Sequence, residues 1–325
     1  MQRFFILQKV EVIVMKKTVV SVGLPADESL RIYKNSLEPE QAAGSGRRLC
    51  VVTGIHGDEL EGQYVCYELN RRIREQMECL WGIVDIYPAL NPLGLDTITR
   101  GIPGFDLDMN RIFPGTGGGS MAEQAAAGIM EDIAGADLCI DIHASNIFLR
   151  EIPQVRLIGQ QDDSLLDMAK CLNVNFIWEY EADTVMESTL SHSLNAAGVP
   201  TLVVEMGVGM RITESYCRQL TDGIFCVMKK LGIWKGETIV PRTPILSRGC
   251  PLAFVNANAA GIFLPSVEHW ESVKEGELLG RILHPLEGTV EESVYAPMSG
   301  MVFTLREYPV VTCGSLLARV VGGDF

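Results

Sequence analysis

The sequence of 325 residues contains no Cys-x-x-Cys pair, although it has nine cysteines. Their number is odd, and Cys50, Cys139 and Cys226 lie inside apolar runs. This distribution is typical of reduced, mostly buried thiols and predicts a cytoplasmic protein rather than one held together by disulfides. A zinc site made of closely spaced thiolates is not expected.

Positive charge is scarce. The chain has 27 Lys and Arg residues against 41 Asp and Glu residues, which gives a formal net charge of −14 at pH 7. A general nucleic-acid binder or a protein of acidic membrane surfaces would need a basic surface, so both classes are disfavoured. A local basic pocket for a small molecule remains compatible with this charge.

Long apolar runs are also absent, and no stretch reaches the length of a transmembrane helix. The first residues are partly apolar, but Arg3, Lys9 and Glu11 interrupt them, which does not fit a signal peptide. Because Met15 offers an alternative start, we interpret residues 1–15 as a non-native or disordered extension.

Residues 16–240 alternate between short apolar runs and longer amphipathic segments. Strands interleaved with helices predict an α/β fold, here a mixed central sheet flanked by helices. The strands are expected over residues 47–53, 82–88, 138–143 and 201–206. The helices are expected over residues 60–74, 121–133, 164–172, 188–197 and 216–231.

The composition changes after Trp234. Residues 241–325 contain short β-like runs separated by Gly and Pro turns, without a long helical pattern. Residues 272–280 and 295–302 look like the halves of a biotinyl- or lipoyl-type fold. Such carriers need a lysine at a hairpin tip, whereas Lys274 lies in the other half of the pattern. We therefore predict a small, barrel-sandwich-like β domain that serves as a lid or as an oligomerisation module of a homo-oligomer.

Three residues are candidate metal ligands. His56 and Glu59 follow the apolar run of residues 47–53, and His143 ends the run of residues 138–143. Sites in α/β sheets gather at the C-terminal ends of strands, so these side chains are expected to meet. Two imidazoles and one carboxylate suit a zinc ion that keeps an open position for water, which predicts a metallohydrolase. The same set suits non-haem iron, so an iron oxygenase is an alternative.

Two further carboxylates lie on the expected strands. Asp141 stands two positions before His143, on the same side of a strand, where it would fix the tautomer of that histidine or hydrogen-bond to the backbone. Glu205 ends an apolar run, where a carboxylate is costly unless it is paired or functional. Near an activated water it would act as the general base and then deliver the proton to the leaving amine.

The segment of residues 91–119 is rich in Gly, Pro and Asp and is long for a loop, a feature often linked to function. It contains Arg100, Asn110 and Arg111. An arginine aimed at the carbonyl oxygen would stabilise the negative charge that amide hydrolysis builds there. The adjacent Asn–Arg pair suits a substrate carboxylate, which it can hold by paired hydrogen bonds.

Taken together, residues 45–325 resemble the succinylglutamate desuccinylase/aspartoacylase family, a branch of the zinc carboxypeptidase-like hydrolases. The motifs that carry the resemblance are Gly54-Ile-His-Gly-Asp-Glu-Leu-Glu-Gly62, then Asn91-Pro-Leu-Gly94 with Asp108-Met-Asn-Arg-Ile-Phe-Pro-Gly115, then Asp141-Ile-His143, and finally Pro200-Thr-Leu-Val-Val-Glu205. The resemblance implies a zinc-dependent deacylase that cleaves an N-acyl group from an amino acid or a related small amine.

The resemblance also implies roles for single residues. One zinc ion per chain would have three protein ligands, which are His56, Glu59 and His143. Glu205 would be the base and Arg100 would polarise the carbonyl. The residues that would bind a substrate carboxylate are Asn110 and Arg111.

The chain departs from this pattern in one respect. Aspartoacylase-like members carry a further arginine shortly before the base strand that reads a second carboxylate, whereas this chain has none between Arg156 and Arg211. This absence speaks against acylaspartate and succinylglutamate as substrates unless Arg150 or Arg156 substitutes. The family's C-terminal domain also tends to lend a residue to the site, and the candidates here are Tyr295 and Tyr308.

Two other functions remain as alternatives. A zinc carboxypeptidase that acts on short peptides would use the same ligands and base. A non-catalytic binding or carrier protein that uses the C-terminal β domain is the alternative outside the enzymes.

Overall fold

The computed structural model describes residues 14–24, 27–39, 45–105, 107–158, 163–180 and 187–323. Its first strands are β1 Val14–Gly23, β2 Ser29–Leu37, β3 Arg48–Thr53, β4 Ile83–Tyr87, β5 Leu138–Ala144, β6 Leu149–Ile158, β7 Phe176–Tyr180 and β8 Thr201–Gly207. The helices are α1 Glu61–Glu75, α2 Pro92–Thr97, α3 Met121–Ile133, α4 Asp163–Cys171, α5 Leu190–Ala196 and α6 Glu214–Lys230, and two short 3-10 helices are η2 Met77–Cys79 and η3 Met109–Arg111. None of the described helices is long and apolar enough to cross a membrane.

The C-terminal part consists of strands. They are β9 Ile245–Leu246, β10 Leu252–Asn256, β11 Gly261–Pro265, β12 Ser272–Val273, β13 Leu278–His284, β14 Thr289–Tyr295, β15 Gly300–Arg306, β16 Val310–Val311 and β17 Leu316–Gly322. Within the described residues, no α-helix follows α6. The residues predicted to lie in a non-native extension fall mostly outside the described part, which begins at residue 14.

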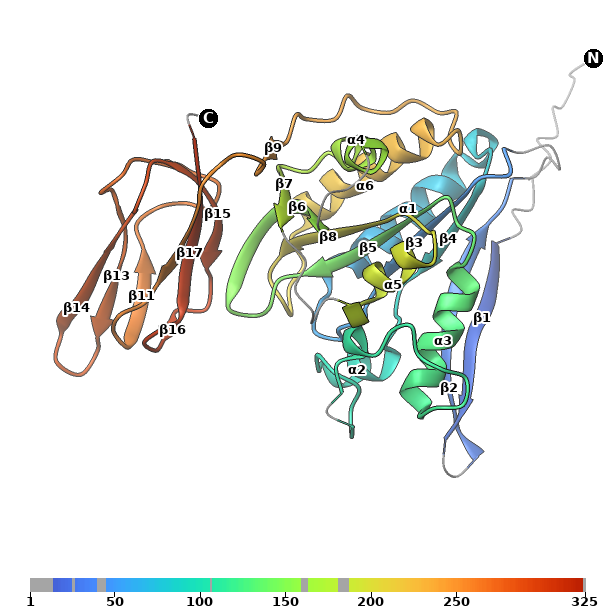
Figure 1. Ribbon diagram of the computed structural model, residues 1–325, viewed down its shortest axis with the longest axis horizontal. Coiled ribbons are helices and arrows are strands. Elements are labelled where there is room, and N and C mark those ends of the chain that lie inside the picture. Colours follow the sequence, from blue (N-terminus) through green and yellow to red (C-terminus); the bar gives the residue numbers. More distant parts are fainter. Residues whose placement is uncertain are drawn as a thin grey trace, which may run out of the picture.

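A mixed sheet runs through the molecule, and helices cover both of its faces (Figure 1). Its main path has the order β1-β2-β4-β3-β5-β8-β6-β15-β17-β10. Strands β4, β3, β5 and β8 are parallel to one another, whereas β2 and β6 are antiparallel to their neighbours β4 and β8. The predicted fold class, a mixed α/β sheet flanked by helices with β structure at the C-terminal end, is confirmed.

The central strands form because their side chains are apolar on both faces. All seven residues of β5 are buried, as expected of a parallel strand between two helical layers. Side chains alternate along β3, so that Val51 packs in the same cluster as Leu69 of α1, while Val52 packs in the same cluster as Ile129 of α3. The sheet is therefore fixed from both sides, which makes its carboxyl edge a rigid platform.

The C-terminal strands continue this sheet. Strand β15 pairs with β6 through Thr304 opposite Glu151, and β17 and β10 follow it outward. A second, antiparallel sheet has the order β14-β13-β11-β16 and packs with the first around Phe263, Leu279 and Leu317. In Figure 1 these strands lie at the end of the molecule opposite β1 and β2. Strand β17 is thus separated from β6 by β15 alone. Side chains of the C-terminal strands therefore lie near the central strands of the sheet.

Candidate functional site

The predicted site residues gather where the parallel strands β3, β5 and β8 end. His56 and Glu59 lie in the turn between β3 and α1, and His143 and Glu205 are paired residues of β5 and β8. The strands run in one direction, so their carboxyl ends share one edge of the sheet. Residues far apart in the sequence are thereby brought together at one place.

Two glycines shape the turn that carries His56. Gly54 has a φ of +69°, a left-handed conformation that favours glycine. A Cβ atom added to Gly57 would lie 1.9 Å from the carbonyl carbon of Gly94, so the two backbones touch at this point. The turn after β3 and the start of the loop of residues 91–119 are therefore held together.

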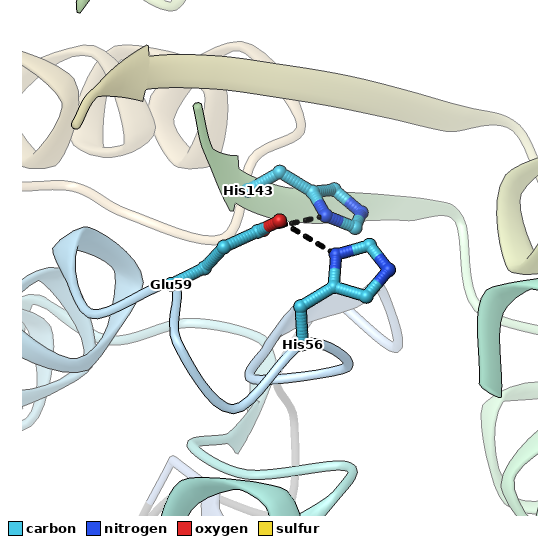
Figure 2. A group of neighbouring side chains, drawn as sticks. All are labelled: His56, Glu59 and His143. Carbon is cyan, nitrogen blue, oxygen red and sulfur yellow. Dashed lines mark hydrogen bonds and ion pairs between the residues drawn. The ribbon is translucent and has the colours of Figure 1, made fainter. Parts of the chain in front are cut away.

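Three buried side chains form the centre of the site. The Nδ1 atom of His56 lies 2.6 Å from Oε1 of Glu59, and Nδ1 of His143 lies 3.0 Å from Oε2 of the same carboxylate (Figure 2). The possible ligand atoms of the three residues all lie within 4.8 Å of one another. Two ring nitrogens and a carboxylate oxygen at this spacing form a donor set that fits a zinc ion.

Each histidine also has a second carboxylate near its other ring nitrogen, Nε2. His56 Nε2 lies 3.1 Å from Oδ1 of Asp108, and His143 Nε2 lies 3.2 Å from Oδ2 of Asp141. Histidines that bind metal typically donate their other ring N–H to a carboxylate, which orients the ring. Asp108 makes this hydrogen bond to His56, which the sequence did not predict. Asp141 lies near His143, as its spacing predicts, but as an ion pair whose carboxylate oxygens have no hydrogen-bond partner among the described residues.

The ionic environment of this centre is consistent with its geometry. Burial lowers the pKa of His56, but Asp108 and Glu59 more than offset this, so its pKa is raised. Burial likewise lowers the pKa of His143, and Asp141 and Glu59 reverse the effect. Burial disfavours the charged form of Glu59, yet both histidines favour it, and its pKa is lowered. The anionic carboxylate of Glu59 and the positive charge of the two histidines therefore stabilise one another in the folded protein.

Glu205 lies beside this centre and contacts an arginine. Its Oε1 atom accepts a hydrogen bond of 3.0 Å from Nη1 of Arg156. Burial raises the pKa of Glu205 above its ordinary value, and the positive charge of Arg156 counteracts this only in part. Of the two arginines considered as substitutes, Arg156 thus lies at the site, while Arg150 forms its ion pair with Glu307.

The loop after α2 contributes the three residues predicted from its sequence. Arg100 lies 3.2 Å from Glu59 and 3.2 Å from Asp108. The side-chain oxygen of Asn110 accepts a hydrogen bond of 2.9 Å from the backbone N–H of Leu190, so it also anchors α5. Arg111 donates to the backbone carbonyl of Asn110 at 2.7 Å.

The three candidate ligands and most of the side chains around them border one cavity of about 250 Å³, whereas Asp108 does not line it. Residues that line it, besides the three candidate ligands, include Arg100, Asn110, Arg111, Asp141 and Glu205. The sequence did not point to three further lining residues, which are Glu151, Ser191 and Arg319. Neither Tyr295 nor Tyr308 borders it, and the C-terminal side chain that does so is Arg319 of β17.

Arg319 could have been noticed in the sequence, because a charged residue inside the apolar run of β17 is costly unless it is paired. Glu151 carries no such signal, because its neighbours in β6 include other polar residues and its exposure of 1% is known only from the structure. Arg319 and Glu151 form an ion pair of 2.7 Å, and nothing in the local sequence of either strand predicts that pairing.

The chain is similar to known proteins of one family. Residues 45–231, more than half of the chain, match the family described as "Succinylglutamate desuccinylase/Aspartoacylase catalytic domain". Over 286 residues the chain is 26% identical to the N-alpha-acetyl-L-2,4-diaminobutyric acid deacetylase of Halomonas elongata, which covers 85% of this chain and 82% of that protein.

Solved structures share the fold over nearly the whole chain. A succinylglutamate desuccinylase/aspartoacylase from Rhodobacter sphaeroides has a TM-score of 0.78 and 24% identity, covering 96% of this chain and 95% of the other. The ectoine utilization protein EutE (DoeB) from Ruegeria pomeroyi, in its product-bound structure, has a TM-score of 0.78 and 22% identity, covering 95% and 94%. The C-terminal strands thus belong to the shared fold as well.

Proposed function

The chain belongs to the succinylglutamate desuccinylase/aspartoacylase family, and on this premise we propose that it is a zinc-dependent hydrolase that cleaves the amide bond of small N-acyl amino acids. The observation that carries the proposal is the convergence of His56, Glu59 and His143, with Glu205 beside them, at the wall of one cavity. The relative from Halomonas elongata is named as a deacetylase of an N-acetylated amino acid, which supports the same class of substrate.

We propose that zinc is held by His56 Nδ1, His143 Nδ1 and the carboxylate of Glu59. Support comes from their spacing within 4.8 Å and from the carboxylates of Asp108 and Asp141 behind the two rings. When bound, zinc would supply a Lewis acid for the amide carbonyl and for the attacking water. The hydrolytic proposal is favoured over an iron oxygenase by the family and by the carboxylate of Glu205 at the cavity wall.

Glu205 is the proposed general base. Arg156 contacts its Oε1 atom, and no partner of Oε2 lies among the described residues, so Oε2 is the atom that takes the proton from water. Burial raises the pKa of Glu205, which strengthens it as a base. The same oxygen would then give the proton to the departing amine, which completes the cleavage.

Arg100 and the Asn110–Arg111 pair are proposed to bind the substrate. Arg100 is half exposed and lies beside Glu59, from where its guanidinium can reach the carbonyl oxygen on which negative charge develops. Arg111 would hold the carboxylate of the amino acid, together with the amide nitrogen of Asn110. The cavity of about 250 Å³ is bordered by Arg319 of β17, which favours small substrates over long peptides.

The wider organisation is proposed as well. Residues 16–240 would form the hydrolase domain, and residues 241–325 a β domain that closes the cavity and allows a homo-oligomer. All nine cysteines are free thiols in the structure, which supports a cytoplasmic location.

The test combines metal analysis with assays of amine release. Purified protein is analysed for bound metal, and N-acetyl amino acids and dipeptides are compared as substrates before and after chelation. About one zinc per chain, with chelation-sensitive release of amines from N-acyl amino acids, is the expected result. Cleavage of dipeptides alone would favour a carboxypeptidase, iron in place of zinc would favour an oxygenase, and absence of any metal would contradict the proposal.

A further inference from the structure

Four arginines line the cavity, and they differ in whether a carboxylate already neutralises them. Arg100 is paired with Glu59 and with Asp108. The other three arginines, together with the carboxylates near them, determine which charged groups of a substrate can find a partner in the cavity. They are Arg111, Arg156 and Arg319.

Arg156 and Arg319 share ion pairs with two carboxylates of the described residues. Glu151 lies 2.7 Å from Nη1 of Arg319 and 3.4 Å from Nη2 of Arg156, and Arg156 reaches Glu205 at 3.0 Å. Two guanidinium groups therefore face two carboxylates, and within the described residues these four charges sum to zero. We call these four residues the neutral wall.

The neutral wall is fixed by the fold. Glu151 is 1% exposed and also accepts hydrogen bonds of 2.8 Å from Gln154 and 2.6 Å from Thr304. The guanidinium carbon of Arg319 lies 5.3 Å from the centre of the ring of Trp178. Since Glu151 sits at the junction of β6, β15 and β17, turning either arginine toward a ligand would leave its buried charge uncompensated.

Arg111 differs from the other three. Its contact with the backbone carbonyl of Asn110 leaves its charge uncompensated, and no described carboxylate lies within 4.0 Å of it. Of the four arginines that line the cavity, it alone has no ion pair among the described residues. The described part of the cavity thus offers one positive charge to an anionic ligand.

We infer that the substrate carries a single carboxylate, bound at Arg111, and that the part of the substrate facing the neutral wall is uncharged or cationic. This inference rests on the proposed deacylase function and narrows its substrates. A second carboxylate, on the side chain or on the acyl group, would meet Glu205 and Glu151 without gaining an unpaired arginine. Like charges brought together in a partly buried site are costly.

The first experiment uses the wild-type protein with zinc and two matched pairs of substrates. N-acetyl-L-asparagine is compared with N-acetyl-L-aspartate, and N-butyryl-L-glutamine with N-succinyl-L-glutamine, since the members of each pair differ mainly by one carboxylate. We expect kcat/KM to be higher by about tenfold or more for the member with one carboxylate. Equal or faster cleavage of the two dicarboxylates would overturn the inference and leave the proposed function standing. Cleavage of none of the four would remove the proposed function, and the inference with it.

The second experiment removes one negative charge from the neutral wall. In Glu151→Gln, Arg319 and Arg156 lose their shared partner, so the aspartate-to-asparagine ratio of kcat/KM is expected to rise about tenfold. The control is Glu307→Gln, which removes a carboxylate paired with Arg150 away from the cavity and should leave the ratio unchanged. Thermal unfolding establishes that each variant is folded. An unchanged ratio in folded Glu151→Gln would overturn the inference, and the wild-type comparison decides the matter if that variant does not fold.

Discussion

Replacing Asp108 by asparagine tests how the site holds its metal. Asp108 lies 3.1 Å from Nε2 of His56, and it also pairs with Arg100 and accepts a hydrogen bond from the backbone N–H of Asn110. The variant keeps the shape of the side chain but removes its charge, so His56 loses the carboxylate that orients its ring. Loss of such a partner typically weakens metal binding by about 10- to 100-fold. This range corresponds to about 1.4 to 2.8 kcal/mol of binding free energy.

The measurement is a zinc competition titration against a chromophoric chelator. The matched control is Asp96→Asn, because Asp96 is an exposed residue of α2 in the same region of the chain. We expect Asp108→Asn to release zinc to a weaker chelator, whereas Asp96→Asn behaves as the wild type. If Asp108→Asn binds zinc within about twofold of the wild type, Asp108 does not support His56 in the way described.

Three further outcomes are expected. Glu205→Gln should lower kcat by about 10²- to 10⁴-fold and retain zinc, and near-full turnover would exclude Glu205 as the base. Because burial raises the pKa of Glu205, kcat/KM of the wild type should fall as the pH drops through that raised pKa, and a flat acidic limb would contradict this. Changing Lys34, which is 6% exposed between Asp85 and Asp132, to Met should lower the free energy of unfolding in urea by about 3 kcal/mol, whereas Lys17→Met, at a partly exposed residue, should lower it by less than about 1 kcal/mol. The pKa of Lys34 is raised in the fold, so Lys34 stabilises the protein fully below its ordinary pKa, and this stabilisation is lost only as the pH rises through the raised pKa. The free energy of unfolding that Lys34→Met loses should therefore be equal at about pH 6 and about pH 9. A loss of stability that grows toward low pH would refute the pairing.

Much of the fold could be predicted because each central strand is recognisable from its own residues. Strands β3, β4, β5 and β8 are short apolar runs, since helices bury both of their faces. Strand β6 was not predicted, because Glu151, Gln154 and Arg156 interrupt its apolar residues. These polar groups are tolerated only through partners on β8, β15 and β17, which local sequence does not reveal.

The candidate site divides in the same way. His56 and Glu59 are three positions apart, and Asp141 and His143 two positions apart, so short-range spacing together with strand ends predicts that they meet. Glu151 and Arg319 are 168 positions apart and meet only because β17 lies beside β15 and β15 beside β6. A contact that depends on the pairing of strands so far apart in the sequence produces no periodic pattern in the sequence of either strand.

The hydrogen bonding of β15 to β6 has a consequence for how such proteins can be recombined. A chain cut between α6 and β9 would leave the first residues of β6 as an unprotected sheet edge and would take Thr304 and Arg319 away from Glu151. A C-terminal segment borrowed from a relative would have to bring a cation that matches Glu151, or bury that carboxylate unpaired. Strands β6 and β17 therefore have to be exchanged together. Chimeras that keep their own β17 should fold more often than those that exchange it.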